Sequence, residues 1–280
     1  MRIRKAKISV EFEAEYNEVE WRDIWIPQTV YKYRDWDRMD HRKILTEQSI
    51  WIPDTNNFND PFDCNIPISY ELIASNENLA EEFIRNLVKA DQSISEMNYE
   101  EEVQNRLQSG KHKDLDFLQN YKKYMLKAMK SVKGVFSVTP INDNILMWSH
   151  YANSHKGFCV GFDSLKLFES LGGGGMVNYE NEYPIISPVA DYTRQYSEQV
   201  LTKSKHWAYE FEYRLTTFNK LNEAIGISAD CISEVIFGVK MDLNTKIEIK
   251  ELAKSKLPHL KFYNVLTEEG NFKLKIVQEE

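Results

Sequence analysis

Apolar and polar residues alternate in many short segments of the chain, which is the pattern of a half-buried β-strand. The alternation is clearest in residues 7–14, where Ile8, Val10 and Phe12 are separated by polar residues. The predicted strands are residues 7–14, 28–34, 49–52, 134–140, 157–162, 176–179, 211–218, 232–239, 260–265 and 272–278. The predicted helices are residues 38–48, 71–90, 93–110, 114–132, 143–154, 164–170, 192–210 and 244–256.

Residues 70–132 differ from the rest of the chain, because apolar residues such as Leu79, Phe83 and Leu87 recur there at helical spacing. This pattern predicts a helical insertion packed on one side of a sheet. The chain is therefore expected to have an α+β fold with a mixed sheet of short strands. We expect one domain over residues 1–280, with residues 70–132 inserted in it.

Composition narrows the class of protein. A chain of 280 residues with 42% hydrophobic residues can bury a substantial core. Its formal net charge of -8 argues against a surface built to bind nucleic-acid phosphates, although a local basic pocket remains compatible with it. No apolar run approaches the length of a membrane span, and the N-terminus lacks the apolar core of a signal peptide.

The cysteines Cys64, Cys159 and Cys231 are odd in number and widely spaced. This spacing disfavours both a disulfide framework and a zinc knuckle, and it fits a reducing compartment. We therefore expect a bacterial cytoplasmic protein with no membrane partner.

Four segments concentrate polar and aromatic residues, namely residues 31–35, 56–63, 142–162 and 205–214. The segment NNFNDPFD, residues 56–63, has more turn-forming residues than a plain surface turn needs. Its Asn and Asp side chains are expected to bond the backbone and to hold Phe58 or Phe62 inward, as one wall of a cleft.

In the last segment, an extended conformation would place Glu210, Glu212 and Arg214 on one strand face. These charges could point into a cleft, or they could form an ion pair between strands. The four glycines at 172–175 lack the Lys-Ser/Thr of a phosphate-binding loop, so we expect a flexible surface connection there. His150 and His155 are five residues apart, which is not the spacing of a helical metal site.

The order of YKYR, NDPFD, MWSHYA, KGFCVGF and YEFEYR resembles the uncharacterised bacterial family known as domain of unknown function 2971. The resemblance extends from about Tyr31 to Lys240. More distantly, the layout resembles an ADP-ribosyltransferase core. That resemblance implies an enzyme that uses NAD and cleaves the nicotinamide–ribose bond, as a toxin or phage-defence effector with a protein or nucleic-acid acceptor.

Residue by residue, the second resemblance implies that Glu212 or Glu210 is the catalytic carboxylate and that Arg34 holds a phosphate of NAD. Tyr33 or Trp148 would stack on the nicotinamide ring. The remaining residues expected to bind the dinucleotide are His150, Tyr151, Asn59, Asp60, Phe62 and Ser137. Positive charge that develops on the ribose would be stabilised by the carboxylate.

Two other functions stay open at this point. The aromatic residues could form the interface of a non-catalytic binding module, such as an antitoxin-like or sensor protein with a protein partner. Alternatively, Asp60, Asp63, His150 and Glu212 could serve a metal-dependent nuclease or hydrolase, although their spacing does not indicate a metal site.

Overall fold

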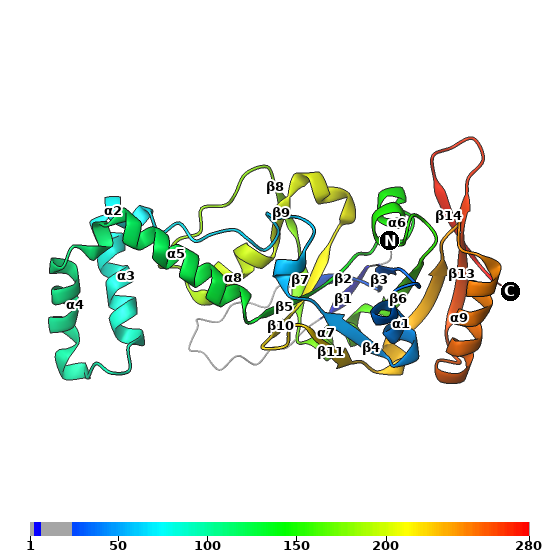
Figure 1. Cartoon of the computed structure of the whole chain (residues 1–280), viewed down its shortest axis with the longest axis horizontal. Helices are drawn as coiled ribbons and strands as arrows, with labels where there is room; N and C mark the ends of the chain where they lie inside the picture. The colour runs from blue at the N-terminus through cyan, green and yellow to red at the C-terminus, as the bar shows by residue number, and fades with distance from the viewer. Residues whose placement is uncertain (1–2, 7–23, 280) are drawn as a thin grey trace. The chain divides into compact units, whose positions relative to one another are not determined.

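The computed structural model describes residues 3–6 and 24–279, which form two compact units (Figure 1). Unit 1 comprises Met1–Pro53, Gly134–Met176 and Ala208–Glu280, and unit 2 comprises Asp54–Lys133 and Val177–Trp207. The predicted strand 7–14 lies outside the described residues. The fold is α+β, with helices and a mixed sheet, as the sequence pattern predicts.

Unit 1 contains most of the strands. Its strands are β1 (Ile3–Ala6), β2 (Ile24–Pro27), β3 (Thr29–Arg34), β4 (Ser49–Ile52), β5 (Lys133–Val138), β6 (Phe158–Asp163), β7 (Gly174–Met176), β10 (Tyr213–Phe218), β11 (Glu223–Gly226), β12 (Ile232–Phe237), β13 (Lys261–Thr267) and β14 (Leu274–Gln278). Its α-helices are α1 (Met39–Thr46), α6 (Ile145–Tyr151), α7 (Ser164–Leu171) and α9 (Leu243–Lys256).

The largest sheet of unit 1 has the strand order β14-β13-β12-β6-β3. β12 and β13 are parallel, with α9 as the connection between them, and the other neighbours are antiparallel. A second sheet has the order β5-β10-β7, and β4 pairs with β11. The long parallel crossover through α9 explains why the sheet is mixed, because parallel neighbours cannot be joined by a tight turn.

Side chains alternate across the five-stranded sheet, so its two faces belong to different clusters. Val30 of β3 and Phe158, Val160 and Phe162 of β6 lie in a core with the buried residues of α1, α7 and α9. The opposite face carries Tyr33, Cys159, Ile236 and Val265, which pack with Met147 and Trp148 of α6. We call these the α1 face and the α6 face.

Unit 2 is mainly helical and has its own apolar core, built from α3, α4 and α5 together with Ile66, Ile68 and Tyr70. Figure 1 shows α3 and α4 side by side, in agreement with their contacts. Its elements are α2 (Leu72–Ser75), α3 (Glu77–Ala90), α4 (Tyr99–Gln108), α5 (Leu115–Lys130), β8 (Asn178–Glu180), α8 (Tyr192–Val200) and β9 (Thr202–Ser204).

The prediction of one long helix over residues 192–210 is wrong. α8 ends at Val200, β9 follows, and residues Lys205–Glu210 form the 3-10 helix η4. β9 pairs in parallel with β8. Helix-forming residues such as Lys203 and Lys205 are overridden here by tertiary contacts, since buried Lys203 is paired with buried Asp63 at 3.6 Å.

The four glycines are also more ordered than expected. Gly172 has φ of +86° and ends α7, while Gly174 and Gly175 form part of β7 and pair with β10. A Cβ atom on Gly174 would lie 1.8 Å from the carbonyl oxygen of Arg214. Glycine is therefore required at this position because another strand approaches its backbone closely.

Candidate functional site

The α6 face of unit 1 brings together several of the expected site residues. α6 begins at Asn144, whose side-chain oxygen accepts hydrogen bonds from the backbone N–H groups of Leu146 and Met147 at 2.9 and 3.1 Å. The Asn144 side-chain amide also donates to the carbonyl of Tyr209 at 3.2 Å. This bond ties the start of α6 to η4 and brings the end of α6 near Glu210.

Tyr33 and Trp148 lie in the core rather than in an open site. Their rings meet edge to face with centroids 5.1 Å apart, and they are 3% and 0% exposed. The Tyr33 hydroxyl donates to the carbonyl of Ile141, and Trp148 Nε1 donates to the carbonyl of Asn142, each at 2.8 Å. Neither ring has a face available to stack on a bound nicotinamide, so both residues position α6.

Tyr151 and Glu210 form the closest polar pair on this face. The Tyr151 hydroxyl donates to Glu210 Oε1 at 2.6 Å, and Glu210 is 3% exposed. Burial raises the pKa of Tyr151, and the charge of Glu210 raises it further, so the phenol keeps its proton as a donor. The hydrogen bond therefore holds the carboxylate in one orientation.

Phe211, the residue after Glu210, has an unusual backbone conformation. Its φ of +45° lies in the left-handed region, which is costly for a bulky side chain, and the ring is 49% exposed. The strand predicted from residue 211 begins only at Tyr213. Glu210 therefore does not share a strand face with Glu212 and Arg214, as the sequence pattern suggested.

Glu212 and Arg214 form a buried ion pair. Arg214 Nε and Nη2 donate to the two carboxylate oxygens of Glu212 at 2.8 and 3.1 Å, and the residues are 4% and 0% exposed. The ion pair is made between residues of the same segment, two positions apart, rather than between strands. A carboxylate held in this way serves the folded structure. Glu210 is therefore the stronger candidate for the catalytic carboxylate.

Arg34 does not lie with Glu210. Its neighbour Tyr33 packs on the α6 face, and the alternation of β3 turns Arg34 to the α1 face, where its guanidinium lies 5.9 Å from the ring of Phe136. The expected crevice shared by this guanidinium and a catalytic glutamate is therefore not formed within unit 1. Ser137, on β5, accepts from the Lys32 side chain through its backbone carbonyl.

His150 is exposed at the end of α6, with its ring 6.2 Å from that of Tyr151. That it binds a dinucleotide stays a prediction. Among the described residues, no group of three or more His, Cys, Asp or Glu side chains is placed to hold a metal ion.

The other three expected residues, Asn59, Asp60 and Phe62, belong to unit 2. Asp60 Oδ1 accepts from the backbone N–H of Phe62 at 2.9 Å, and its Oδ2 accepts from Trp207 Nε1 at 2.7 Å. Asn59 is exposed, and Phe62 is 60% exposed instead of turned inward. The NDPFD loop is thus held in shape by its carboxylates.

Sequence reasoning missed a second polar pair on the α6 face, formed by Tyr31 and Glu234. The Tyr31 ring and the Glu234 side chain both lie beside Gly161, and burial raises the pKa of the Glu234 carboxyl. Gly161 leaves room for them, because a Cβ there would lie 2.5 Å from Glu234 Cγ. The available signal was a single acidic residue within the apolar strand ISEVIF.

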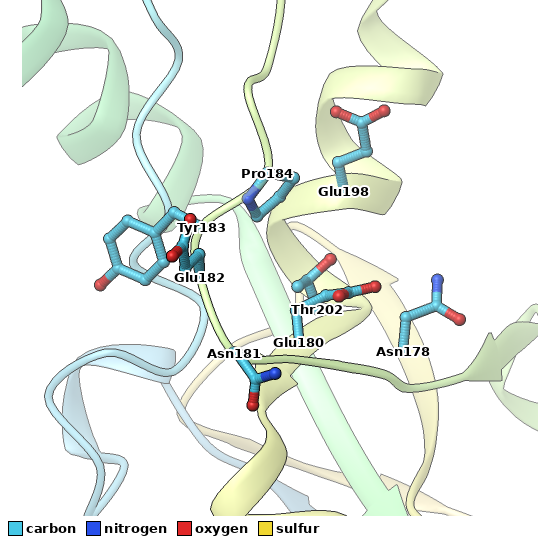
Figure 2. A pocket seen from close by; sticks show the side chains of 8 residues that line it. All are labelled: Asn178, Glu180, Asn181, Glu182, Tyr183, Pro184, Glu198 and Thr202. Carbon is cyan, nitrogen blue, oxygen red and sulfur yellow. The ribbon is translucent and has the colours of Figure 1, made fainter.

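Unit 2 contains a pocket of about 530 Å³ (Figure 2). Figure 2 shows Glu198 projecting from α8 near Thr202 and Glu180, with the ring of Tyr183 turned away from them. Its lining residues are Asn178, Glu180, Asn181, Glu182, Tyr183, Pro184, Glu198 and Thr202. Three carboxylates make this pocket unfavourable for the phosphates of a dinucleotide.

Comparison with known proteins gives one match. The model of the family described as protein of unknown function (DUF2971) matches residues 147–215, which confirms the resemblance for this segment. The matched segment includes Tyr151, Glu210 and the Glu212–Arg214 pair. No curated protein and no solved structure matches the chain, so the likeness to ADP-ribosyltransferases stays a prediction.

In the described part of the chain, none of the helices combines the length and the apolar character needed to span a membrane.

Proposed function

We propose that unit 1 is an enzyme that cleaves an N-glycosidic bond, with Glu210 as the catalytic carboxylate and NAD as its substrate. The observation that carries this proposal is the 2.6 Å hydrogen bond from Tyr151 to Glu210, directly before a residue with left-handed backbone. Backbone strain is concentrated at functional sites in many proteins, where the surrounding structure maintains it.

The chemistry requires a carboxylate that is fixed before the reaction begins. When the nicotinamide–ribose bond breaks, nicotinamide leaves with the electron pair and the ribose acquires oxocarbenium character. A preorganised carboxylate beside the ribose stabilises this charge more than water does. Water or another acceptor then bonds to the ribose carbon and loses its proton. Tyr151 supports the reaction by holding Glu210 in place, and Tyr151 itself remains protonated.

The geometry changes which residues the proposal includes. Tyr33 and Trp148 position α6 from within the core, Glu212 is engaged by Arg214, and Arg34 faces the other side of the sheet. The site is therefore proposed from Glu210, Tyr151 and the exposed His150. The choice of NAD rests on the sequence resemblance, and the choice of bond rests on the carboxylate.

The test is release of nicotinamide from NAD, measured by chromatography with purified protein. We expect Glu210→Gln to lower the rate at least about 100-fold, because the stabilising charge is removed. Tyr151→Phe is expected to lower it about tenfold, since one orienting hydrogen bond is lost. Both variants should keep the circular dichroism spectrum of the wild type.

Two matched controls use the same substitutions at distant exposed positions. Glu248→Gln and Tyr192→Phe should leave the rate within about twofold of the wild type, because such surface changes have small effects. Absence of nicotinamide release from the wild-type protein, or a Glu210→Gln variant as active as the wild type, would overturn the proposal.

The proposed biological setting is a toxin or phage-defence effector. Expression in a bacterial host should then arrest growth, and Glu210→Gln should restore growth at equal protein level. If the wild-type protein releases nicotinamide in vitro but does not affect growth, the proposed activity stands and the proposed biological setting is wrong.

A second function, that of a binding module, is favoured by a different observation in unit 2. Phe62 and Tyr183 are 60% and 49% exposed, and their rings are in edge contact with centroids 6.4 Å apart. Exposed aromatic pairs are common anchors of protein interfaces. Phe62→Ser should abolish recovery of a partner protein that the wild type binds. Phe272→Ser is the control, because Phe272 is fully exposed in unit 1, and this variant should still bind the partner.

A further inference from the structure

Among residues 3–6 and 24–279, no carboxylate forms an ion pair with Arg34. The residue is half-buried, and within the described part of the chain its Nε atom is buried without a hydrogen-bond partner. Burial lowers the pKa of Arg34 to about 10, and the neighbouring charges act on it through space rather than through hydrogen bonds. Burying the Nε–H group of a guanidinium without an acceptor is unfavourable.

A second cation lies beside it. Lys32 and Arg34 project from the same face of β3, and their charged groups lie 4.9 and 5.9 Å from the centre of the same ring, Phe136. Attraction to an aromatic ring offsets part of the cost of burying a cation. It does not remove the repulsion between two like charges that converge on one side chain.

The nearby carboxylates are engaged elsewhere. Arg38 donates from Nε and Nη2 to the two oxygens of Asp40, at 3.2 and 2.8 Å. Asp35 Oδ1 accepts from the backbone N–H of Asp37 at 3.0 Å and from the Asn153 side chain at 3.1 Å. Among the described residues, these acids therefore make no hydrogen bond to Arg34, and Asp40 acts on its charge only through space.

His41 on α1 adds no negative charge. Its Nδ1 accepts from the backbone N–H of Asp35 at 3.0 Å, so the ring proton is on Nε2. Burial lowers the pKa of His41 to about 3, and the charge of Arg34 is the next cause. The ring is neutral at pH 7, so it offers Arg34 no counter-charge.

We infer that Arg34 is the anchor of a binding site for a small oxyanion at the end of β3, beside α1. An oxyanion would supply the missing acceptor for the guanidinium fork, which matches the oxygens of phosphate or carboxylate. The site is separate from Glu210, which belongs to the α6 face, and it does not depend on the proposed cleavage of NAD.

The test is calorimetric titration with inorganic phosphate and, separately, with acetate, each at constant ionic strength maintained with chloride. We expect phosphate, acetate or both to bind the wild type with one site per chain. The two arms distinguish a phosphoryl group from a carboxylate as the natural ligand. If neither anion binds, the inference is wrong.

Variants connect the binding to Arg34. Arg34→Gln should weaken the anion at least about tenfold, because a charge-assisted bidentate contact is lost. Arg34→Lys keeps the charge without the fork, so an intermediate loss is expected. Arg194→Gln is the matched control, since Arg194 is exposed and paired with Glu198 in unit 2, and it should bind as the wild type does.

Stability gives a second measurement on the same variants. A bound anion raises the melting temperature of the protein that binds it. Phosphate or acetate should therefore raise the melting temperature of the wild type and of Arg194→Gln, and not that of Arg34→Gln. If Arg34→Gln does not fold, Arg34→Lys takes its place. An anion affinity unchanged by substitution of Arg34 would contradict the inference.

Discussion

The polar clusters of the two units use similar residues in different ways. In unit 2, the carboxylates of the NDPFD loop pair with side chains of β9 and η4. Asp60 accepts a hydrogen bond from Trp207 of η4, and Asp63 forms an ion pair with Lys203 of β9. In unit 1, Glu210 is held by the hydroxyl of Tyr151, and the buried Nε of Arg34 has no hydrogen-bond partner in the part of the chain that the structure describes. The difference shows that a dense polar motif can serve folding, while sparser residues carry the candidate chemistry.

The largest expected effect on stability is at the buried ion pair of unit 1. Glu212→Gln should lower the free energy of unfolding by roughly 3–5 kcal/mol, because the buried ion pair with Arg214 would be broken. Urea denaturation measures the change. This would separate Glu212 from Glu210, for which the same substitution should affect activity.

Glu248→Gln is the control for this measurement, since Glu248 is half-exposed and pairs with Arg42 at 3.3 Å on the surface. It should cost less than about 1 kcal/mol. A Glu212→Gln variant with wild-type stability and no activity would reverse the roles that we assign to the two glutamates.

The next largest effect is expected at the loop of unit 2. Asp60→Ala removes the acceptor of both Trp207 Nε1 and the Phe62 backbone N–H. The expected loss is about 2–3 kcal/mol, as hydrogen bonds to a buried charged group are lost. Thermal unfolding measures it, with Asn57→Ala at an exposed position of the same loop as the control.

If Asp60→Ala leaves stability unchanged but alters binding or turnover, the loop has a functional role and the contrast between the units fails. An equal loss in Asn57→Ala would show that any change in this loop is destabilising.

A smaller effect of opposite sign is expected at Phe211. Phe211→Gly removes the cost of a left-handed backbone for a bulky residue, so stability should rise by about 1 kcal/mol. The rate of nicotinamide release should fall, because Glu210 would be held less firmly. Asn219→Gly is the control, since Asn219 has φ of +56° and asparagine tolerates this conformation. A Phe211→Gly variant that is less stable than the wild type would show that the ring contributes packing.

The smallest effect is a pH dependence in unit 2. Buried Lys133 donates to Gln199 Oε1 at 3.0 Å and lies 4.4 Å from the centre of the Tyr196 ring. Burial lowers its pKa from 10.5 to about 8, so the unfolded chain binds more protons than the folded one between these values. Above the unfolded pKa the lysine is neutral in both states, and its burial does not lower the free energy of unfolding. As the pH falls through the folded pKa the buried lysine takes up a proton, and this part of the stability is lost.

Between pH 7 and pH 8.5, the free energy of unfolding of the wild type should rise relative to that of Lys133→Met, by less than about 1 kcal/mol. Urea denaturation of both proteins at the two pH values measures this gain, and Lys203→Met tests whether another buried lysine of unit 2 behaves alike. A gain of the opposite sign would show that Lys133 is charged more readily when the protein is folded.

Part of the candidate site could be predicted from the sequence. Tyr151 and Glu210 were identified from a concentration of aromatic and acidic residues, and the structure brings them together. Arg34 was expected beside them because the resemblance to an ADP-ribosyltransferase core implies that it holds a phosphate of NAD. One residue of register decides the face of a strand, so Arg34 and Tyr33 lie on opposite faces and only Tyr33 contacts α6.

By itself, the sequence determined the α+β class, the approximate extent of the helices in residues 70–132 and the polar residues available for chemistry, because these follow from local periodicity and composition. Tertiary structure alone decided that residues 202–210 leave the helix, that Glu212 is engaged by Arg214 and that Glu234 meets Tyr31. These outcomes depend on partners distant in the chain or on the energy of burying charge, which no local pattern contains.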